Sequence, residues 1–406
     1  MGCSGSKKHV IVNEPTLGNQ DESFMGKIKD LSTQRNFANE AELALIQLTY
    51  NHLKEINDER RNVWLQTITN DILAPIYFSS INNFAYSTAN PFEPVPGIIM
   101  SLRSKDYESL KKSKNELCYA LLHMFHSCNT HFKIDILKTQ RLFLAICENY
   151  QDNPFHNFYH AFSVCQMIFA LSEAHSQFSK FLTLSDTFAL LISALGHDLN
   201  HPGVTNIFMI NSRHSLAVRY NDYSVLENHH ASTLIKFLEL PGCDIFTESL
   251  CDPNTMRKIL IETILATDMS KHNFVIEKFI SVVGHFNKDN KDHRQSFADI
   301  LLHACDIGNP VLKFDLATVW SFKIIQEFNE QVWKEEKLGI PVSEHMRIGT
   351  DLTKIKRNQI GFIDMFIHPL WLVLSIHLEN IQEYLDSIEK NRENWEVLET
   401  LNLSLD

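Results

Sequence analysis

Three candidate metal ligands lie close together in the segment 195–202, where His197 and Asp198 are adjacent and His201 follows one helical turn later. The apolar segment 188–195 precedes them and predicts a buried helix that ends at this polar pair. Burying an imidazole beside a carboxylate is costly unless each has a partner, and a divalent cation would be a partner for both. Because an adjacent His–Asp pair also recurs by chance, the other ligands must be sought elsewhere in the chain.

Two further candidates are His156 and His160, which lie four residues apart. In a helix this spacing puts both imidazoles on one face, with about 5–6 Å between their Cβ atoms. They could bind the same metal, or one could bind it while the other faces the substrate. The alternative is a pair of buried histidines that are satisfied by hydrogen bonds, and the motif alone favours that alternative.

A third candidate is Asp306, which follows the strongly apolar segment 300–305 and precedes Gly308 and Pro310. Aspartate is rarely buried unless it is paired. Asp306 is therefore either a polar residue in the turn after a helix or a metal ligand supplied from a distant part of the chain.

Two polar clusters, one around Glu227 and one around Thr267, lie beside apolar segments. Side chains of this kind could orient the ligands and waters of a metal centre. The alternative is an ordinary polar helix surface, and the residues alone do not decide between the two.

Gln359 and Phe362 lie three residues apart at the start of an apolar segment. An amide carries both a donor and an acceptor, so Gln359 could recognise a purine edge while the ring of Phe362 stacks on the base. Most pairs with this spacing are only helix surface and helix core, which is the alternative here.

The elements that position these residues are predicted to be helices throughout. The chain has 406 residues, of which 44% are hydrophobic, and it contains only 13 glycines and 12 prolines. Apolar residues recur every three to four positions over long segments, which is typical of α-helices. We therefore expect an all-α, compact multi-helix domain. The expected helices span residues 115–126, 134–148, 160–176, 185–195, 229–238, 256–267, 297–305, 316–336 and 360–388.

Charge and composition exclude several classes of protein. The formal net charge is −12, from 37 basic and 49 acidic residues, and the sequence has no long run of Lys and Arg and no interleaving of aromatic with basic residues, so no nucleic acid is expected as a partner. The eight cysteines form no CxxC pair and lie mostly in apolar helical segments, which predicts small buried residues in a reducing compartment. No apolar segment reaches transmembrane length, and no secretory signal opens the chain.

Residues 1–8 fit a signal for N-terminal acylation. Gly2 becomes the first residue when the initiator methionine is removed, Ser6 stands where N-myristoylation requires it, and Cys3 is a candidate for palmitoylation. One myristoyl chain holds a protein only marginally, so a second signal is expected. We therefore expect the protein at the cytoplasmic face of a membrane and otherwise in the cytosol. The alternative is an ordinary unmodified start.

Residues 9–80 are predicted to form a flexible linker followed by a helical segment over 38–73. That segment could serve regulation or dimerisation, which would make the protein a homodimer, or it could simply pack on the main domain. The Pro-rich segment 90–97 indicates a boundary zone, and the main domain is expected over 81–402.

Taken in order, these motifs resemble those of the class I 3′,5′-cyclic nucleotide phosphodiesterases, a branch of the HD-type metal phosphohydrolases. The resemblance covers roughly residues 80–400, and the order, spacing and number of the motifs make it specific. It implies the all-α HD-type fold and identifies 81–402 as a phosphodiesterase catalytic domain. The motifs are His156-Asn157-x-x-His160, His197-Asp198-x-x-His201-Pro202-Gly203-x-x-Asn206, Leu226-Glu227-Asn228-His229-His230, Ala266-Thr267-Asp268-Met269, Asp306 and Gln359-x-Gly361-Phe362.

The resemblance implies two divalent cations. Asp198 would bridge a tighter ion, expected to be zinc, and a largely water-coordinated ion, expected to be magnesium or manganese. Glu227 and Thr267 would orient waters on the second ion, and His201 would hydrogen-bond the bridging hydroxide. The ligands of the tighter ion would be His160, His197, Asp198 and Asp306.

For the nucleotide, the resemblance implies that Asn309 and Gln359 face the base and that Phe362 clamps it against Ile324. His156 has no metal role in this scheme and is free to act as general acid on the departing 3′ oxygen, since an imidazole titrates near working pH. The implied reaction is hydrolysis of the 3′ phosphoester of a cyclic nucleotide to the 5′-monophosphate by the bridging hydroxide, which ends cyclic nucleotide signalling.

The choice between cGMP and cAMP rests on finer likenesses. The segments 155–158 and 219–222 resemble the high-affinity cGMP-specific branch, whereas Phe328 stands where that branch has Tyr, as in cAMP-preferring members. Asn309 occurs in both, and a rotating Gln359 amide could suit either base. We expect cGMP, with cAMP or dual specificity as alternatives.

Two other functions remain alternatives. The first is a generic HD phosphohydrolase that acts on another phosphoester, and Gln359 with Phe362 argues against it. The second is an inactive membrane-tethered scaffold, and the complete ligand set argues against that. Phe155 replaces the Tyr of many family members and removes a hydroxyl near the ligands, but Phe also occurs there in the family.

Overall fold

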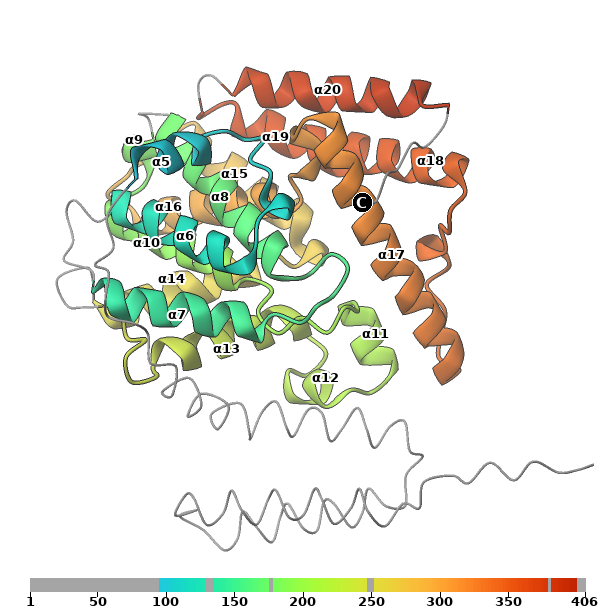
Figure 1. The fold of residues 1–406 in the computed structure, drawn as a ribbon, viewed down its shortest axis with the longest axis horizontal. Coiled ribbons are helices and arrows are strands. Elements are labelled where there is room, and N and C mark those ends of the chain that lie inside the picture. The colour runs from blue at the N-terminus through green and yellow to red at the C-terminus, as the bar shows by residue number, and fades with distance from the viewer. Residues whose placement is uncertain (1–94, 129–134, 175–177, 247–251, 379–380, 400–406) are drawn as a thin grey trace, which may run out of the picture. The chain divides into compact units, whose positions relative to one another are not determined.

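The computed structural model describes residues 95–128, 135–174, 178–246, 252–378 and 381–399 (Figure 1). All regular elements over these residues are helices, which confirms the predicted all-α fold. The predicted acylation signal over 1–8 and the predicted linker and helix over 9–80 lie outside the described residues. The elements are α5 (Pro96–Leu102), η2 (Ser109–Lys111), α6 (Lys114–Cys128), α7 (Ile136–Asn149), α8 (Phe158–Ala174), α9 (Phe178–Phe181), α10 (Leu184–Gly196), α11 (Asn206–Asn211), α12 (Ser215–Arg219), α13 (Val225–Leu238), α14 (Pro253–Leu265), η4 (Met269–Lys271), α15 (His272–Val283), α16 (Lys291–Asp306), η5 (Asn309–Val311), α17 (Phe314–Leu338), η6 (Glu344–Met346), α18 (Leu352–Phe362), η7 (Ile363–Ile367), α19 (His368–Leu374) and α20 (Gln382–Val397).

Helix α10 lies in the core and packs against α8, α14 and α16. It begins with a capping box, in which Thr183 Oγ1 accepts from the N–H of Asp186 at 3.1 Å and the Asp186 carboxylate accepts from the N–H of Thr183 at 2.9 Å. Arg294 of α16 donates to the same carboxylate at 2.7 Å. At the other end, a Cβ on Gly196 would lie 2.7 Å from Leu234, so glycine permits the close approach of α13.

Three helix ends meet because α8, α10 and α16 pack against one another. The first turn of α8 and the last turns of α10 and α16 therefore bring polar residues from three distant parts of the sequence to one place. Each of these helices is mostly buried, so the polar ends lie next to an apolar core.

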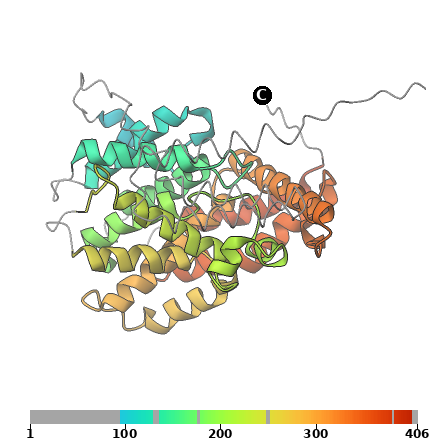
Figure 2. The same ribbon diagram turned by 90° about the horizontal axis from the view of Figure 1, so that it is seen from below.

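Helix α17 has 25 residues and lies beside α18 and α20 (Figure 1). Figure 2 shows the C-terminal helices, coloured orange to red, gathered on one side of the described domain. Asn391 of α20 donates to the carbonyl oxygens of Pro310 and Leu312, both at 2.7 Å. Helix α20 thereby fixes the turn from which α17 starts.

The prediction of a single helix over 360–388 is wrong. Helix α18 ends at Phe362, a π-helical turn occupies Ile363–Ile367, and α19 starts at His368. Pro369 has no N–H to continue the regular α-helical hydrogen bonds, which favours a change of winding before it. The apolar spacing continues across the break because α19 and α20 bury their apolar faces in the same core. The other eight expected helices are present, whereas α5, α9, α11, α12 and α15 were not anticipated.

None of the helices in the described part of the chain is both long and apolar enough to cross a membrane. Five cysteines lie there with their side chains buried, as predicted from their apolar surroundings. They are Cys118, Cys147, Cys165, Cys243 and Cys305.

Candidate functional site

Four predicted ligands come together where the three helices meet. One ligand atom from each lies within 4.8 Å of the other three. Asp306 Oδ1 is 3.0 Å from both His160 Nε2 and His197 Nε2. Asp198 Oδ2 is 3.1 Å from His197 Nε2 and 3.4 Å from His160 Nε2. We call these four residues, His160, His197, Asp198 and Asp306, the ligand cluster.

Local hydrogen bonds turn the two imidazoles toward the cluster. Asn157 Oδ1 accepts from the N–H groups of Tyr159 at 2.9 Å and His160 at 3.3 Å, which starts α8 at this point. His197 caps the end of α10, and its Nδ1 donates to the carbonyl oxygen of Ala194 at 2.8 Å. The Nε2 of a neutral His197 therefore directs a lone pair at the cluster, as a metal ligand must.

The ligand cluster fits one divalent cation. Ligand atoms at about 2.0–2.2 Å from one ion lie roughly 3–3.5 Å from one another, and the four imidazole–carboxylate distances in the cluster are 3.0–3.4 Å. Asp198 Oδ2 is buried and has no hydrogen-bond partner among the described residues. Burial opposes its ionisation, but positive charge beside it holds the pKa of Asp198 well below its usual value. A buried anionic oxygen of this kind requires a cation.

A second group of side chains lies beside the cluster and contains His156, His201 and Glu327. The rings of His156 and His201 stack, with centroids 4.0 Å apart and planes at 21°. Glu327 of α17 contacts His156 Nδ1 through Oε1, and its Oε2 accepts from the N–H groups of Phe155 at 3.0 Å and His156 at 3.1 Å. Burial lowers the pKa of His156, but the negative charges of Glu327 and, next, Asp198 outweigh burial and raise the pKa to about 9. The imidazole therefore carries its second proton at neutral pH.

His201 is neutral in this group. Its Nδ1 accepts from the N–H of Gly203 at 3.0 Å, so the proton of the ring lies on Nε2. Burial and the nearby charge of His156 hold the pKa of His201 well below its usual value. Asn153 Nδ2 donates to the carbonyl oxygens of His156 at 2.8 Å and His201 at 2.7 Å, which ties the two segments together. His201 thus presents an Nε2–H donor.

His230 faces the ligand cluster from α13. Its Nε2 lies 3.7 Å from Asp198 Oδ1, and the two residues form a third close group with His201. The Nδ1 of His230 donates to the carbonyl oxygen of Leu199 at 2.8 Å. Burial lowers the pKa of His230 to about 4, so its Nε2 also directs a lone pair at the site.

Glu227 and Thr267, which were predicted to orient waters, have different surroundings. Glu227 is half-buried and accepts from Asn206 Nδ2 at 3.0 and 3.2 Å. Burial and the charge of Asp268 raise the pKa of Glu227 to about 7. Thr267 is buried, and its hydroxyl donates back to the carbonyl oxygen of Ile264 at 2.8 Å. The water-orienting roles of both residues stay predictions.

The residues predicted to hold the base come from three elements. Gln359 of α18 is buried, with Oε1 2.8 Å from Ser321 Oγ of α17 and Nε2 donating to Asn358 Oδ1 at 3.2 Å. Phe362 follows one turn later in α18, and Ile324 lies one turn after Ser321 in α17; both are half-buried against the core. The remaining residue, Asn309, begins η5, just before the turn that α20 holds.

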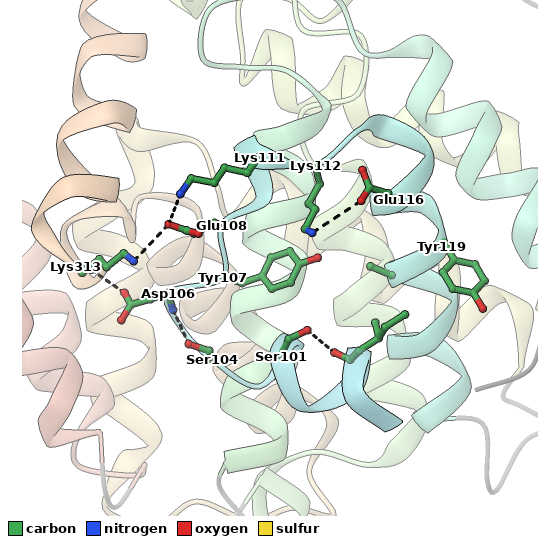
Figure 3. A pocket seen from close by; sticks show the side chains of 12 residues that line it. Ser101, Ser104, Asp106, Tyr107, Glu108, Lys111, Lys112, Glu116, Tyr119 and Lys313 are labelled. Atoms are coloured by element: carbon green, nitrogen blue, oxygen red, sulfur yellow. Dashed lines mark hydrogen bonds and ion pairs between the residues drawn. The ribbon is translucent and has the colours of Figure 1, made fainter. Parts of the chain in front are cut away.

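A cavity of about 550 Å³ lies between α5, η2 and α6 (Figure 3). None of the predicted site residues lines it. Its lysines are engaged with carboxylates: Glu108 pairs with Lys111 at 3.0 Å and with Lys313 at 3.5 Å. Asp106, on the same wall, accepts from the N–H of Lys313 at 2.7 Å. These contacts with Lys313 help to hold the start of α17. We do not place the nucleotide in this cavity.

Residues 155–388 match the family model for the 3′5′-cyclic nucleotide phosphodiesterase. The chain belongs to the 3′5′-cyclic nucleotide phosphodiesterase family. The ligand cluster, the His156 group and the residues predicted to hold the base all lie within the matched part of the chain.

Named relatives and a solved structure agree with this membership. A Mus musculus relative named high affinity cGMP-specific 3′,5′-cyclic phosphodiesterase 9A is 34% identical over 315 residues, which cover 76% of this chain and 58% of the relative. A Drosophila melanogaster relative named 3′,5′-cyclic-AMP phosphodiesterase, isoform F, is 35% identical over 272 residues, which cover 64% of this chain and 40% of the relative. The crystal structure of the phosphodiesterase domain of the RhoPDE fusion protein from the choanoflagellate Salpingoeca rosetta matches with a TM-score of 0.69 and 34% identity, covering 73% of this chain and 95% of that one. The chain spans about half the length of the curated relatives that it matches.

Analysis of the sequence did not assign individual roles to Glu327 and His230. Glu327 lies three residues after Ile324, on the core-facing side of a helix that had been predicted. An acidic residue at such a position is rarely buried unless paired, and this signal could have found it. His230 lies midway between the buried residues Leu226 and Leu234 at helical spacing, which also indicates a buried, partnered side chain.

Proposed function

We propose that this phosphodiesterase-family chain hydrolyses the 3′ phosphoester of a 3′,5′-cyclic nucleotide to the 5′-monophosphate. The observation that supports this most directly is the setting of His156, a protonated imidazole held by Glu327 and stacked on His201 beside the ligand cluster. A proton donor next to a cation site is what cleavage of a phosphodiester at neutral pH requires.

The proposed ligands would bind two divalent cations. Two imidazole nitrogens and two carboxylate oxygens form a donor set typical of zinc, so we infer zinc in the ligand cluster. Asp198 would use its other oxygen for a second cation, and magnesium or manganese fits a site rich in oxygen and water. When bound, the two cations neutralise the phosphate and lower the pKa of water.

The protein's own groups would handle the protons. His156 would give its proton to the departing 3′ oxygen, which otherwise leaves as a strongly basic alkoxide. Because Glu327 occupies Nδ1, the donor would be Nε2. His201 would hydrogen-bond the attacking water through its Nε2–H, and Glu227 would orient a water on the second cation.

We propose cGMP as the substrate, with cAMP or both nucleotides as the alternatives. The cGMP-specific name of the mouse relative supports cGMP, and the Drosophila relative supports cAMP. Ser321 Oγ lies 2.8 Å from both the carbonyl oxygen of Ala317 and Gln359 Oε1, and its single proton can serve only one of them. If the proton goes to Ala317, the amide must turn its NH₂ toward Ser321, which reverses the donor–acceptor order that it offers to a purine.

The ratio of kcat/KM values for cGMP and cAMP with added magnesium tests both the activity and the preference. A panel of other phosphoesters tests the generic phosphohydrolase alternative. Metal analysis together with turnover of the same sample tests the inactive scaffold, because that alternative expects no turnover of any substrate even when metal is supplied.

Gln359→Ala is expected to raise KM for the preferred nucleotide with a smaller change in kcat. The base would lose its amide partner in a buried pocket, a cost of about 1–3 kcal/mol, which corresponds to about fivefold to 150-fold in KM. Steady-state kinetics with both nucleotides measures it. Gln382→Ala is the matched control, because Gln382 is an exposed glutamine on α20. Unchanged KM and unchanged preference in Gln359→Ala would remove this residue from the pocket.

We also propose that the protein is anchored to a membrane through acyl groups on Gly2 and Cys3. The support is the sequence pattern Met1-Gly2-Cys3-Ser4-Gly5-Ser6, which lies outside the described residues. A single myristoyl chain binds reversibly, and a second chain on Cys3 makes attachment stable. The predicted helical segment over 38–73 is the proposed route to a homodimer.

Gly2→Ala is expected to release the protein from membranes into the cytosol, since myristoylation normally precedes palmitoylation at such a site. Cys3→Ser should leave a partial, reversible association. Fractionation of cells together with mass spectrometry of the N-terminus measures both. Wild-type protein that is wholly soluble with an unmodified N-terminus would contradict the anchor and leave the active-site proposal untouched.

A further inference from the structure

Three polar side chains spaced by four residues lie buried on one face of α17. Glu327, Gln331 and Glu335 have exposed fractions of 4%, 1% and 0%. Burying such groups is costly unless each has partners, so the question is what each one holds. Glu327 accepts hydrogen bonds from the backbone N–H groups of Phe155 and His156, as described above. The other two face different segments of the chain.

The side-chain amide of Gln331 forms hydrogen bonds with Thr205 and Glu335. Its Oε1 accepts from the N–H of Thr205 at 2.8 Å, and its Nε2 donates to Thr205 Oγ1 at 3.1 Å. The same Nε2 donates to Glu335 Oε1 at 2.8 Å. Glu335 in turn accepts from the N–H of Ser343 at 2.7 Å and from its hydroxyl at 2.8 Å. Glu335 therefore fixes the direction of the Gln331 amide.

Thr205 lies between two parts of the proposed active site. It caps α11 by accepting from the N–H of Phe208 at 3.3 Å. Its neighbour Asn206 donates to the carboxylate of Glu227 and accepts from the N–H of Leu226 at 2.9 Å. Four residues before Thr205 stands His201. A shift of Thr205 would therefore move His201 and the partner of Glu227 together.

We propose that Gln331, braced by Glu335, is a positioning residue that holds the segment 201–206 in register with His156. The proposal rests on the proposed phosphodiesterase function and explains how α17 positions two parts of its active site. Glu327 fixes the proton donor, and Gln331, one turn along the same helix, fixes the segment on the metal side. The two halves of the site thus keep their separation because Glu327 and Gln331 lie one turn apart on one uninterrupted α-helix.

Gln331→Leu tests the proposal with little change in side-chain volume. It should lower kcat by about tenfold to a hundredfold and weaken binding of Mn²⁺ by a similar factor, as is typical when support of a metal site is lost. KM should change less than about twofold, because Gln359 and Phe362 are untouched. Kinetics and calorimetric titration of Mn²⁺ into the purified full-length protein give the two readouts. Gln326→Leu is the control, since Gln326 lies on the exposed side of α17 and its side chain hydrogen-bonds Glu330 alone among the described residues.

Thr205→Val is the second variant and keeps the backbone N–H while removing Oγ1. Its losses should overlap with those of Gln331→Leu, so that the double variant loses less than the product of the two single effects. Independent, multiplicative losses would overturn the proposal. So would a Gln331→Leu protein that melts earlier but, when folded, has wild-type kcat and Mn²⁺ affinity. Wild-type protein that binds Mn²⁺ yet turns over no nucleotide would instead contradict the proposed function. In that case the Mn²⁺ affinities of wild type and Gln331→Leu would still show whether Gln331 positions the metal side of the site.

Discussion

Asp306→Ala is expected to abolish turnover and to lower the zinc bound to the protein. Asp306 is distant in sequence from the other ligands, yet its Oδ1 lies 3.0 Å from the Nε2 atoms of His160 and His197. Loss of this oxygen removes one of four ligands and leaves two imidazoles without their anionic neighbour. A metal contributes several kcal/mol to stabilising the transition state, so kcat should fall by about 10³-fold or more.

Metal analysis and turnover of the same Asp306→Ala preparation measure the effect. Asp364→Ala is a matched control, because Asp364 is an exposed aspartate that pairs with Arg392 on the surface. The control should keep both zinc and activity. Normal zinc content and normal activity in Asp306→Ala would remove Asp306 from the metal site.

His156→Ala is expected to keep the metals and to lose about 10²–10⁴ in rate, which is the usual contribution of a general acid. His156 lies outside the ligand cluster, and its Nδ1 is taken by Glu327. However, His156, His201 and Glu327 also offer ligand atoms within 4.8 Å of one another. Metal analysis therefore decides the role: loss of metal in His156→Ala would make it a ligand.

The dependence of rate on pH tests the same role through Glu327. The protonated form of His156 is the proposed acid, so activity is present below its pKa and is lost as the pH rises through it. Glu327 raises that pKa, and Glu327→Gln should lower it and move the alkaline limb of the pH–rate profile to lower pH. Glu336→Gln, at an exposed position on the same helix, should leave the limb in place. A fall in rate with an unmoved limb would mean that Glu327 does not act through His156.

Local sequence was enough to predict most of the helices and the types of residue at their ends. Helices α8, α10 and α16 follow from apolar spacing, and the polar residues that end or start them were recognised as ligand candidates. The physical reason is that spacing and capping act over a few residues, which a sequence displays directly. The break after Phe362 was missed because α19 and α20 keep the same apolar spacing.

Only the tertiary structure shows which partners the candidate residues have. The sequence alone left His156 and His160 open between ligands, a substrate contact and buried structural histidines. The packing of α8 against α10 and α16 puts His160 in the ligand cluster, and the approach of α17 puts His156 beside Glu327. Their tautomers also depend on contacts, such as His201 with Gly203, that only a folded backbone supplies.

The sequence by itself thus determined the helical fold, the likeness to a family and the kinds of ligand available. Tertiary structure decided which atoms meet, and it revealed Glu327 and Gln331 as the residues that hold the two halves of the site. Hydrogen bonds such as that between Thr205 and Gln331 join residues 126 positions apart. No local pattern encodes such a contact, because it depends on where one long helix packs against loops that are distant in the chain.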